Sequence, residues 1–134
     1  MSRIVANRIM TPDGTVLQSF HVHDYKSYTD KNGLTYMVDG GLDYLRRTVH
    51  PENEATELSV YDDDPFYLIR QTFHWGTRGK NGDQPLKWKP LSNLADDHID
   101  AIIETQKQVP EHLLNIFKQE IEWRKQHASK VSKL

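Results

Sequence analysis

The hydrophobic pattern of this chain changes its period once, near Asp64-Pro65, and this change constrains the fold more than any other feature. Before it, short runs with β-branched residues are separated by Asp-Gly, Asn-Gly and Gly-Gly turns, as in antiparallel strands. After it, apolar residues recur every three or four positions, as in helices. Segregated strands and helices indicate the α+β class, with an N-terminal antiparallel β-sheet followed by two C-terminal α-helices.

The pattern also predicts where the elements lie. A first helix is expected from the Asp64-Pro65 cap up to Trp75, because Asp is a favoured N-cap and Pro a favoured first helical residue. A glycine-rich loop follows, and then an extended segment over 84–90. Ser92 or Asn93 is expected to cap the next helix, and Pro110 to begin the last one. Strands are expected at 3–10, 15–22, 34–38, 42–49 and 57–61.

The length of 134 residues predicts a single domain, which we place at 1–128, with a polar and disordered tail at 129–134. Hydrophobic residues make up only 37% of the chain, which indicates a thin core or a surface that self-association buries. We therefore expect a homodimer or a higher homo-oligomer.

The composition narrows the location and the partners. The chain has no cysteine, no signal-peptide pattern and no apolar run of membrane-spanning length, so we expect a cytoplasmic protein without a membrane partner. The net charge of −2 argues against wrapping duplex nucleic acid, which needs a basic face. Local basic clusters within a balanced total suit a small anionic ligand instead.

The segment from Phe73 onwards is the main candidate for such a ligand. Its glycines let backbone N–H groups approach a phosphate, and Arg78 or Lys80 can neutralise the charge. Trp75 or Phe73 can stack on a purine, and Asn81 adds an amide. The other interpretation is an ordinary surface loop, with Phe73 in the core and Trp75 packed beneath it.

Three further arginines are candidates for anion binding: Arg46, Arg47 and Arg70. Guanidinium groups hold phosphate in bidentate fashion and stay charged, which suits capture without turnover. Arg46 and Arg47 are neighbours on an expected strand, so they face opposite sides and only one of them reaches a given pocket. Ordinary solvated charge is the other interpretation.

A second group of residues carries an alternative chemistry. His21 and His23 point the same way if they lie on a strand, and with Asp24 they form a candidate metal or acid–base site. A third ligand at suitable spacing is missing, and the polar outer face of a half-buried strand is the other interpretation. We find no nucleophile elbow or triad, so we expect no catalytic residue, no metal and no cofactor.

Three segments carry a resemblance to a known family: residues 6–15 (ANRIMTPDGT), 36–41 (YMVDGG) and 74–77 (HWGT). They resemble small proteins of tailed bacteriophages and prophages, and within that group the Thoeris anti-defence sponge proteins of the first type described. The resemblance spans nearly the whole chain and adds little after Arg124.

The resemblance implies an N-terminal sheet and two C-terminal helices. It also implies a protein that sequesters cyclic ADP-ribose isomers, made as an alarm signal by a bacterial TIR-domain enzyme, without cleaving them. In the family the pockets lie at dimer interfaces, and dimers assemble into hexamers that also hold cyclic oligonucleotides. Family binding residues are aromatic, arginine and asparagine, for which the nearest candidates here are Phe73, Trp75, Asn81, Arg46, Arg47 and Arg70.

Two alternatives stay open. One is a metal-assisted phosphoesterase that uses His21, His23 and Asp24. The other is a phage protein that inhibits a host enzyme by direct contact through its two C-terminal helices.

Overall fold

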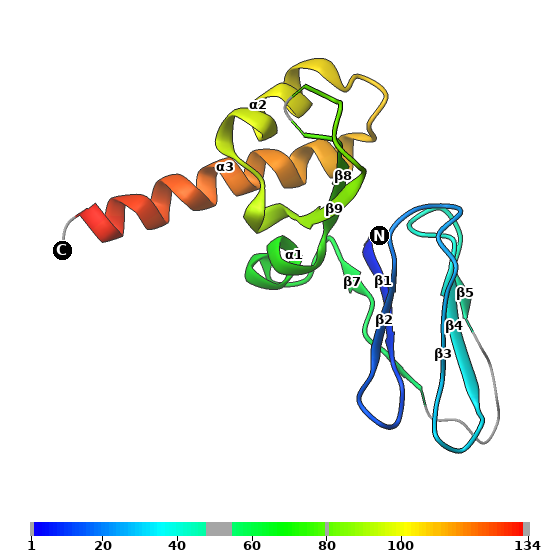
Figure 1. Cartoon of the computed structure of the whole chain (residues 1–134). Coiled ribbons are helices and arrows are strands. Elements are labelled where there is room, and N and C mark those ends of the chain that lie inside the picture. Colours follow the sequence, from blue (N-terminus) through cyan, green and yellow to red (C-terminus); the bar gives the residue numbers. More distant parts are fainter. Residues whose placement is uncertain (1, 48–54, 80, 133–134) are drawn as a thin grey trace. The chain divides into compact units, whose positions relative to one another are not determined.

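A computed structural model describes residues 2–47, 55–79 and 81–132, with side chains described up to residue 128 (Figure 1). The chain divides into two compact units, Met1–Thr72 and Phe73–Leu134, where the sequence pattern predicts one domain over 1–128. Antiparallel strands dominate the first unit and the two long helices belong to the second. The predicted α+β class is confirmed.

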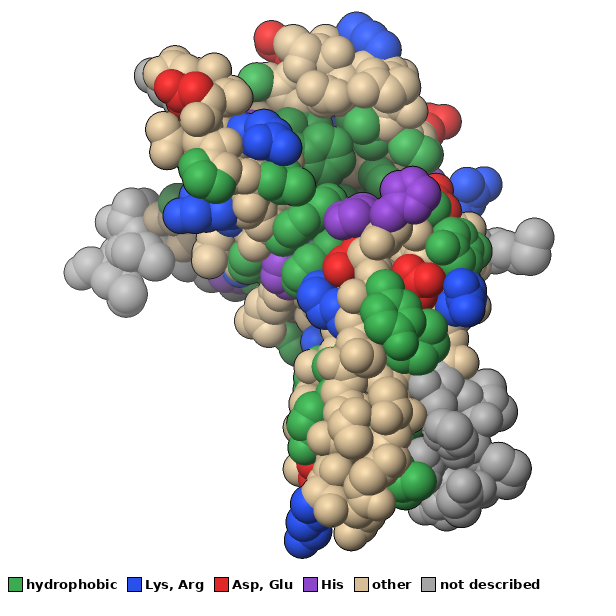
Figure 2. All heavy atoms as spheres, turned by 45° about the vertical axis from the view of Figure 1, so that its right-hand side comes forward, with side chains coloured by type: hydrophobic (Ala, Val, Ile, Leu, Met, Phe, Trp, Pro, Cys, Tyr) green, Lys and Arg blue, Asp and Glu red, His purple; other side chains and the backbone are tan. Residues whose placement is uncertain are grey.

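Unit 1 contains two antiparallel sheets and one short helix. In the first sheet the order is β2-β1-β6 and β7 also pairs with β1, while the second sheet has the order β3-β4-β5. On the face in Figure 2, unit 1 shows mainly polar side chains and backbone, in tan, with scattered hydrophobic side chains in green. The elements are β1 (Ile4–Met10), β2 (Val16–Ser19), β3 (Lys26–Thr29), β4 (Thr35–Asp39), β5 (Arg46–Arg47), β6 (Thr56–Glu57), β7 (Val60–Tyr61) and α1 (Phe66–Thr72).

The core of unit 1 forms where inward-facing residues of the two hairpins meet. Ile9 and Leu17 come from β1 and β2, and Tyr36 and Val38 come from β4, where alternate residues share one face. Polar groups join the two sheets as well. Buried Asn7 of β1 donates from Nδ2 to the backbone carbonyl that ends β4, with 3.1 Å between the atoms.

Unit 2 is a β-hairpin followed by two helices. Phe117 of α3 lies at its centre, with its ring meeting Phe73 edge-on at 5.7 Å and Trp75 edge-on at 5.2 Å between centroids. Leu91 and Ile99 are fully buried in the same core. The elements are β8 (His74–Thr77), β9 (Lys87–Pro90), the 3₁₀ turn η1 (Leu91–Asn93), α2 (Asp96–Thr105) and α3 (Glu111–Ser132).

An ionic cluster fastens α3 to the preceding turn and helix. Glu120 is fully buried and accepts a hydrogen bond from Arg124, one helical turn later. Arg124 also donates to the carboxylate of Asp96 and to the backbone carbonyl of Leu91. None of the helices in the described residues is both long and apolar enough to cross a bilayer.

Several predicted boundaries in unit 1 were wrong. The strand expected over 15–22 ends at Ser19, because the Asp24 carboxylate accepts the backbone N–H of Phe20 and folds the chain into a turn. That turn leads into β3, which the pattern missed. In the strand expected over 42–49, only Arg46–Arg47 is extended, and residues 48–49 lie outside the described residues.

The boundaries of unit 2 also differ from those predicted. The helix expected to reach Trp75 ends at Thr72, and His74–Thr77 is a strand that pairs with β9. The next helix begins at Asp96 with Ala95 as its N-cap, because Ser92 and Asn93 belong to the 3₁₀ turn. The last helix is continuous to Ser132 and thus extends into the segment 129–134 that was expected to be a disordered tail.

Candidate functional site

A pocket of about 730 Å³ lies within unit 2, between the β8–β9 hairpin and α2. Its volume falls within the range of about 300–1,000 Å³ that is typical of small-molecule sites. The lining combines cationic, amide, hydroxyl and aliphatic groups with one carboxylate and one imidazole. The residues that line it are Thr77, Gly79, Gln84, Pro85, Lys87, Lys89, Asn93, Leu94, Ala95, Asp97, His98 and Ala101.

The strand β9 supplies both cations. Lys87 and Lys89 are two residues apart, so their side chains leave the same face of the strand. Thr77 pairs directly with Lys87 in the hairpin register, and its side chain shares this face. No salt bridge among the described residues involves Lys87 or Lys89.

On the opposite face of the hairpin, the side chain of Trp88 lies against β8. Trp88, between the two lysines, pairs with Gly76 of β8. A Cβ built on Gly76 would lie 3.2 Å from the indole ring of Trp88 and 3.2 Å from Leu86. The absent side chain of Gly76 therefore leaves room for the indole to lie close against the hairpin.

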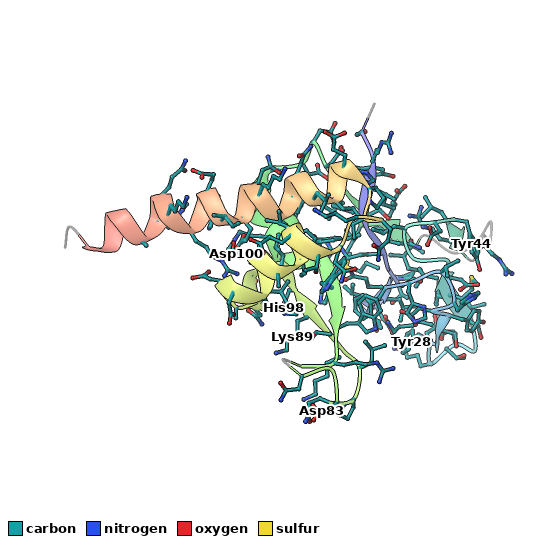
Figure 3. All side chains as sticks on the ribbon, turned by 90° about the horizontal axis from the view of Figure 1, so that it is seen from above. Tyr28, Tyr44, Asp83, Lys89, His98 and Asp100 are labelled. Carbon is teal, nitrogen blue, oxygen red and sulfur yellow. The ribbon has the colours of Figure 1, made fainter. Side chains whose placement is uncertain are left out.

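The helix α2 supplies the other wall. Its first-turn residues Asp97 and His98 line the pocket together with Ala101, one turn later. Figure 3 shows His98 of α2 next to Lys89 of β9. Ala95, the N-cap, makes no side-chain capping hydrogen bond, so the first-turn N–H groups keep their capacity to bind an acceptor.

The pocket lining combines groups of opposite charge. The ammonium groups of Lys87 and Lys89 and the N-terminus of α2 favour an anion. The carboxylate of Asp97 disfavours one at its own position. The arrangement suits a ligand that carries negative charge on one part and hydrogen-bond donors on another.

Both ends of the glycine-rich loop line this pocket, through Gly79 and Gln84, while Lys80 lies outside the described residues. Gly79 lines the pocket with a φ of 85°, in the left-handed region that glycine tolerates. The backbone carbonyl of Arg78 accepts the N–H of Gln84 at 2.9 Å, which closes the loop. The side chains of Arg78 and Asn81 are exposed and are not among the lining residues.

The two predicted aromatic ligands lie in or against the core. Phe73 is only 2% exposed and its backbone carbonyl accepts the N–H of Leu91. Trp75 is partly buried and packs edge-on against Phe117. Both positions agree with the alternative interpretation of the sequence, in which Phe73 is a core residue and Trp75 packs against it.

The three predicted arginines belong to unit 1, whereas the residues that line this pocket belong to unit 2. Arg46 is exposed and pairs with Asp39 at 3.5 Å. Arg47 is only 20% exposed and contacts Glu57 at 3.4 Å, Asn7 at 3.3 Å and the Ser59 hydroxyl, so it joins the two sheets. Arg70 lies in the last turn of α1. Three of the seven candidates therefore belong to unit 1, and the other four belong to unit 2.

The histidines of the alternative site lie in the turn between β2 and β3. His21 accepts the backbone N–H of His23 at Nδ1, so the strand geometry expected for the pair is wrong. The Asp24 carboxylate accepts from the backbone N–H of Phe20 and from Lys26. The described residues contain no group of three or more metal-binding side chains close enough to share an ion.

The charged residues that the pocket brings together were not among those predicted from the sequence. Lys87 and Lys89 alternate with Trp88, and this period of two was enough to place both cations on one face of a strand. No local signal shows that Asn93, Asp97 and His98 face that strand. Comparison of the chain with protein-family models, curated proteins and solved structures gave no match.

Proposed function

We propose that this chain is a binding protein that captures a small cyclic nucleotide in the pocket of unit 2 and releases it unchanged. The observation that carries the proposal is the pair of lysines, Lys87 and Lys89, on one face of β9 and facing the first turn of α2. Lysine binds phosphate as a point charge, which suits the capture of an anion.

The class of ligand comes from the family resemblance. Cyclic ADP-ribose isomers are compact, doubly charged and rich in hydroxyl groups, and cyclic oligonucleotides share these properties. Amide and hydroxyl side chains beside the lysines, from Gln84, Asn93 and Thr77, match such a ligand. The protein would act in the cytoplasm of the bacterial host as an anti-defence sponge, as a homodimer or a larger homo-oligomer.

The metal-assisted phosphoesterase is the weaker proposal. Its candidate residue Asp24 already accepts hydrogen bonds from Phe20 and Lys26, which stabilise the turn. Inhibition of a host enzyme through α2 and α3 is a further alternative, for which the described residues offer no particular contact.

Ligand capture is tested by mixing the purified full-length protein with cyclic ADP-ribose isomers, removing unbound ligand and heating the complex. We expect mass spectrometry to find intact cyclic nucleotide in the released fraction. Recovery of a linear or degraded product would show an enzyme instead. No retained nucleotide would contradict the proposal.

The pocket is tested with the double variant Lys87→Met and Lys89→Met. A hydrogen bond to a charged group contributes about 1.5–3 kcal/mol, so loss of both cations is expected to weaken binding by at least about 100-fold. Lys118→Met is the matched control, since Lys118 is exposed on α3 and is not a lining residue. Equal affinity of the double variant and the control would place the ligand elsewhere.

A further inference from the structure

Asp97 places a carboxylate in a pocket whose other charged lining residues are Lys87 and Lys89. The side chain is exposed, and no salt bridge among the described residues holds it. A carboxylate at this position opposes the entry of a ligand that is anionic all over. The pocket therefore presents opposite charges at different positions along its lining.

Stabilisation of α2 is the simplest role for Asp97, because acidic residues in the first turn complement the helix dipole. Asp96 occupies the same turn, however, and its carboxylate is held by Arg124 at 2.6 Å. The two neighbours thus have different surroundings: Asp96 belongs to the ionic cluster of α3, whereas Asp97 lines the pocket. Helix stabilisation alone does not require the second carboxylate to lie there.

An ionised carboxylate can only accept hydrogen bonds, so its partners in a ligand are donor groups, among them the hydroxyls of a sugar. Dinucleotide-binding folds use an acidic residue in this way, to hold ribose hydroxyls close to a phosphate site. We infer that Asp97 is a specificity-determining residue, which selects ligands with free sugar hydroxyls beside their phosphates and rejects polyanions without hydroxyls. The inference rests on the proposed function, because it assumes that phosphates bind at Lys87 and Lys89.

The test compares three probes on the full-length protein by isothermal titration calorimetry: ADP, 2′,3′-dideoxy-ADP and inorganic pyrophosphate. We expect wild-type protein to bind ADP about 10-fold more tightly than the dideoxy analogue. In Asp97→Ala this preference should fall to about twofold or less. In both Asp97→Ala and Asp97→Asn the affinity for pyrophosphate should rise several-fold, because a negative charge is removed.

Asp100→Asn is the matched control. Asp100 is exposed on the same helix, lies outside the lining residues, and loses the same charge in the substitution (Figure 3). If this control raises the pyrophosphate affinity as much as Asp97→Asn does, the effect is one of net charge and the inference is overturned.

The outcomes also separate the inference from the proposed function. An Asp97→Ala variant that keeps the full preference for ADP overturns the inference and leaves nucleotide capture standing. Wild-type protein that binds none of the three probes overturns it as well, while cyclic ADP-ribose titrated in the same series decides the proposed function. Circular dichroism of each variant verifies that α2 is retained.

Discussion

The guanidinium of Arg124 donates from Nε to the buried carboxylate of Glu120, with 2.6 Å between Nε and Oε2. Burial lowers the pKa of Arg124, but hydrogen bonds to Asp96 and Glu120 outweigh it and raise the pKa, so the guanidinium stays charged. The side chain of Glu120 is 0% exposed, so this ion pair lies at the edge of the core. The same guanidinium reaches the backbone carbonyl of Leu91, directly after β9.

Arg124→Met is expected to destabilise the protein by about 3–5 kcal/mol, because it leaves a buried carboxylate without its guanidinium. Urea denaturation monitored by circular dichroism measures the change. Lys125→Met is the control, since the pair of Lys125 with Glu122 is exposed, and it should cost about 1 kcal/mol or less. A similar cost for both variants would show that the buried pair is not what stabilises α3.

Binding should also distinguish the pocket from the glycine-rich loop. Arg78→Ala and Asn81→Ala are expected to change the affinity for cyclic ADP-ribose by about twofold or less, while Lys89→Ala lowers it by about 10-fold. Calorimetric titration of the three variants measures this. If Arg78→Ala has the largest effect, the loop rather than the pocket binds the ligand.

The pKa of Asp13 lies well below its ordinary value, because the Thr11 hydroxyl and then the Tyr28 hydroxyl donate to its carboxylate. A depressed pKa contributes stability above the ordinary carboxyl pKa of 3.8, and this contribution is lost as the pH falls through the folded-state value. Tyr28→Phe should therefore raise the pKa of Asp13 and move the acid unfolding of the protein to higher pH.

Carboxyl-carbon NMR titration of Asp13 measures the first effect, and acid unfolding followed by fluorescence measures the second. Tyr25→Phe is the control, because Tyr25 is 57% exposed and makes no hydrogen bond to Asp13 among the described contacts. An unchanged Asp13 titration in Tyr28→Phe would contradict the role of the Tyr28 hydroxyl.

Gly41 is required both by its backbone conformation and by its neighbours. Its φ is 55°, and a Cβ built there would lie 2.5 Å from the backbone carbonyl carbon of His21. Gly14 also has a positive φ, 91°, but nothing lies within 4 Å of its built Cβ. Gly14→Ala should cost about 1–2 kcal/mol of strain, and Gly41→Ala about 1–3 kcal/mol more for overpacking. Thermal denaturation of the two variants compares these costs, and equal values would exclude the steric contribution.

Long periodic patterns made the two C-terminal helices predictable. The apolar stripe through Ile99 and Ile102 marked α2, and Pro110 marked the start of α3. The end of α1 was not predictable in this way, since Phe73 continues the helical spacing from Ile69. The residue after it, His74, begins β8, and this strand pairs with β9. The partner of His74 is Pro90, which lies well outside a short window of sequence. Non-local pairing of this kind leaves no mark in a short window of sequence.

The site was predictable only in part, for a related reason. The sequence marked the neighbourhood of the glycine-rich loop, and Gly79 does line the pocket. The candidates predicted from the sequence were mainly arginine and aromatic residues, because these residue types bind nucleotides well. In the structure Phe73 packs against Phe117, and Arg47 joins the two sheets of unit 1. His98 and Asp97 became candidates only once α2 was seen to face β9.

Gly76 of β8 does not line the pocket, but it lies next to the residue between the two lysines. Adding one methyl group at Gly76 would push on the indole of Trp88, 3.2 Å away, and the flanking lysines share its backbone. If the backbone of β9 shifts along with the ring, Lys87 and Lys89 shift too, because they flank Trp88 in the same strand. A residue outside the pocket lining would then change where its two positive charges lie.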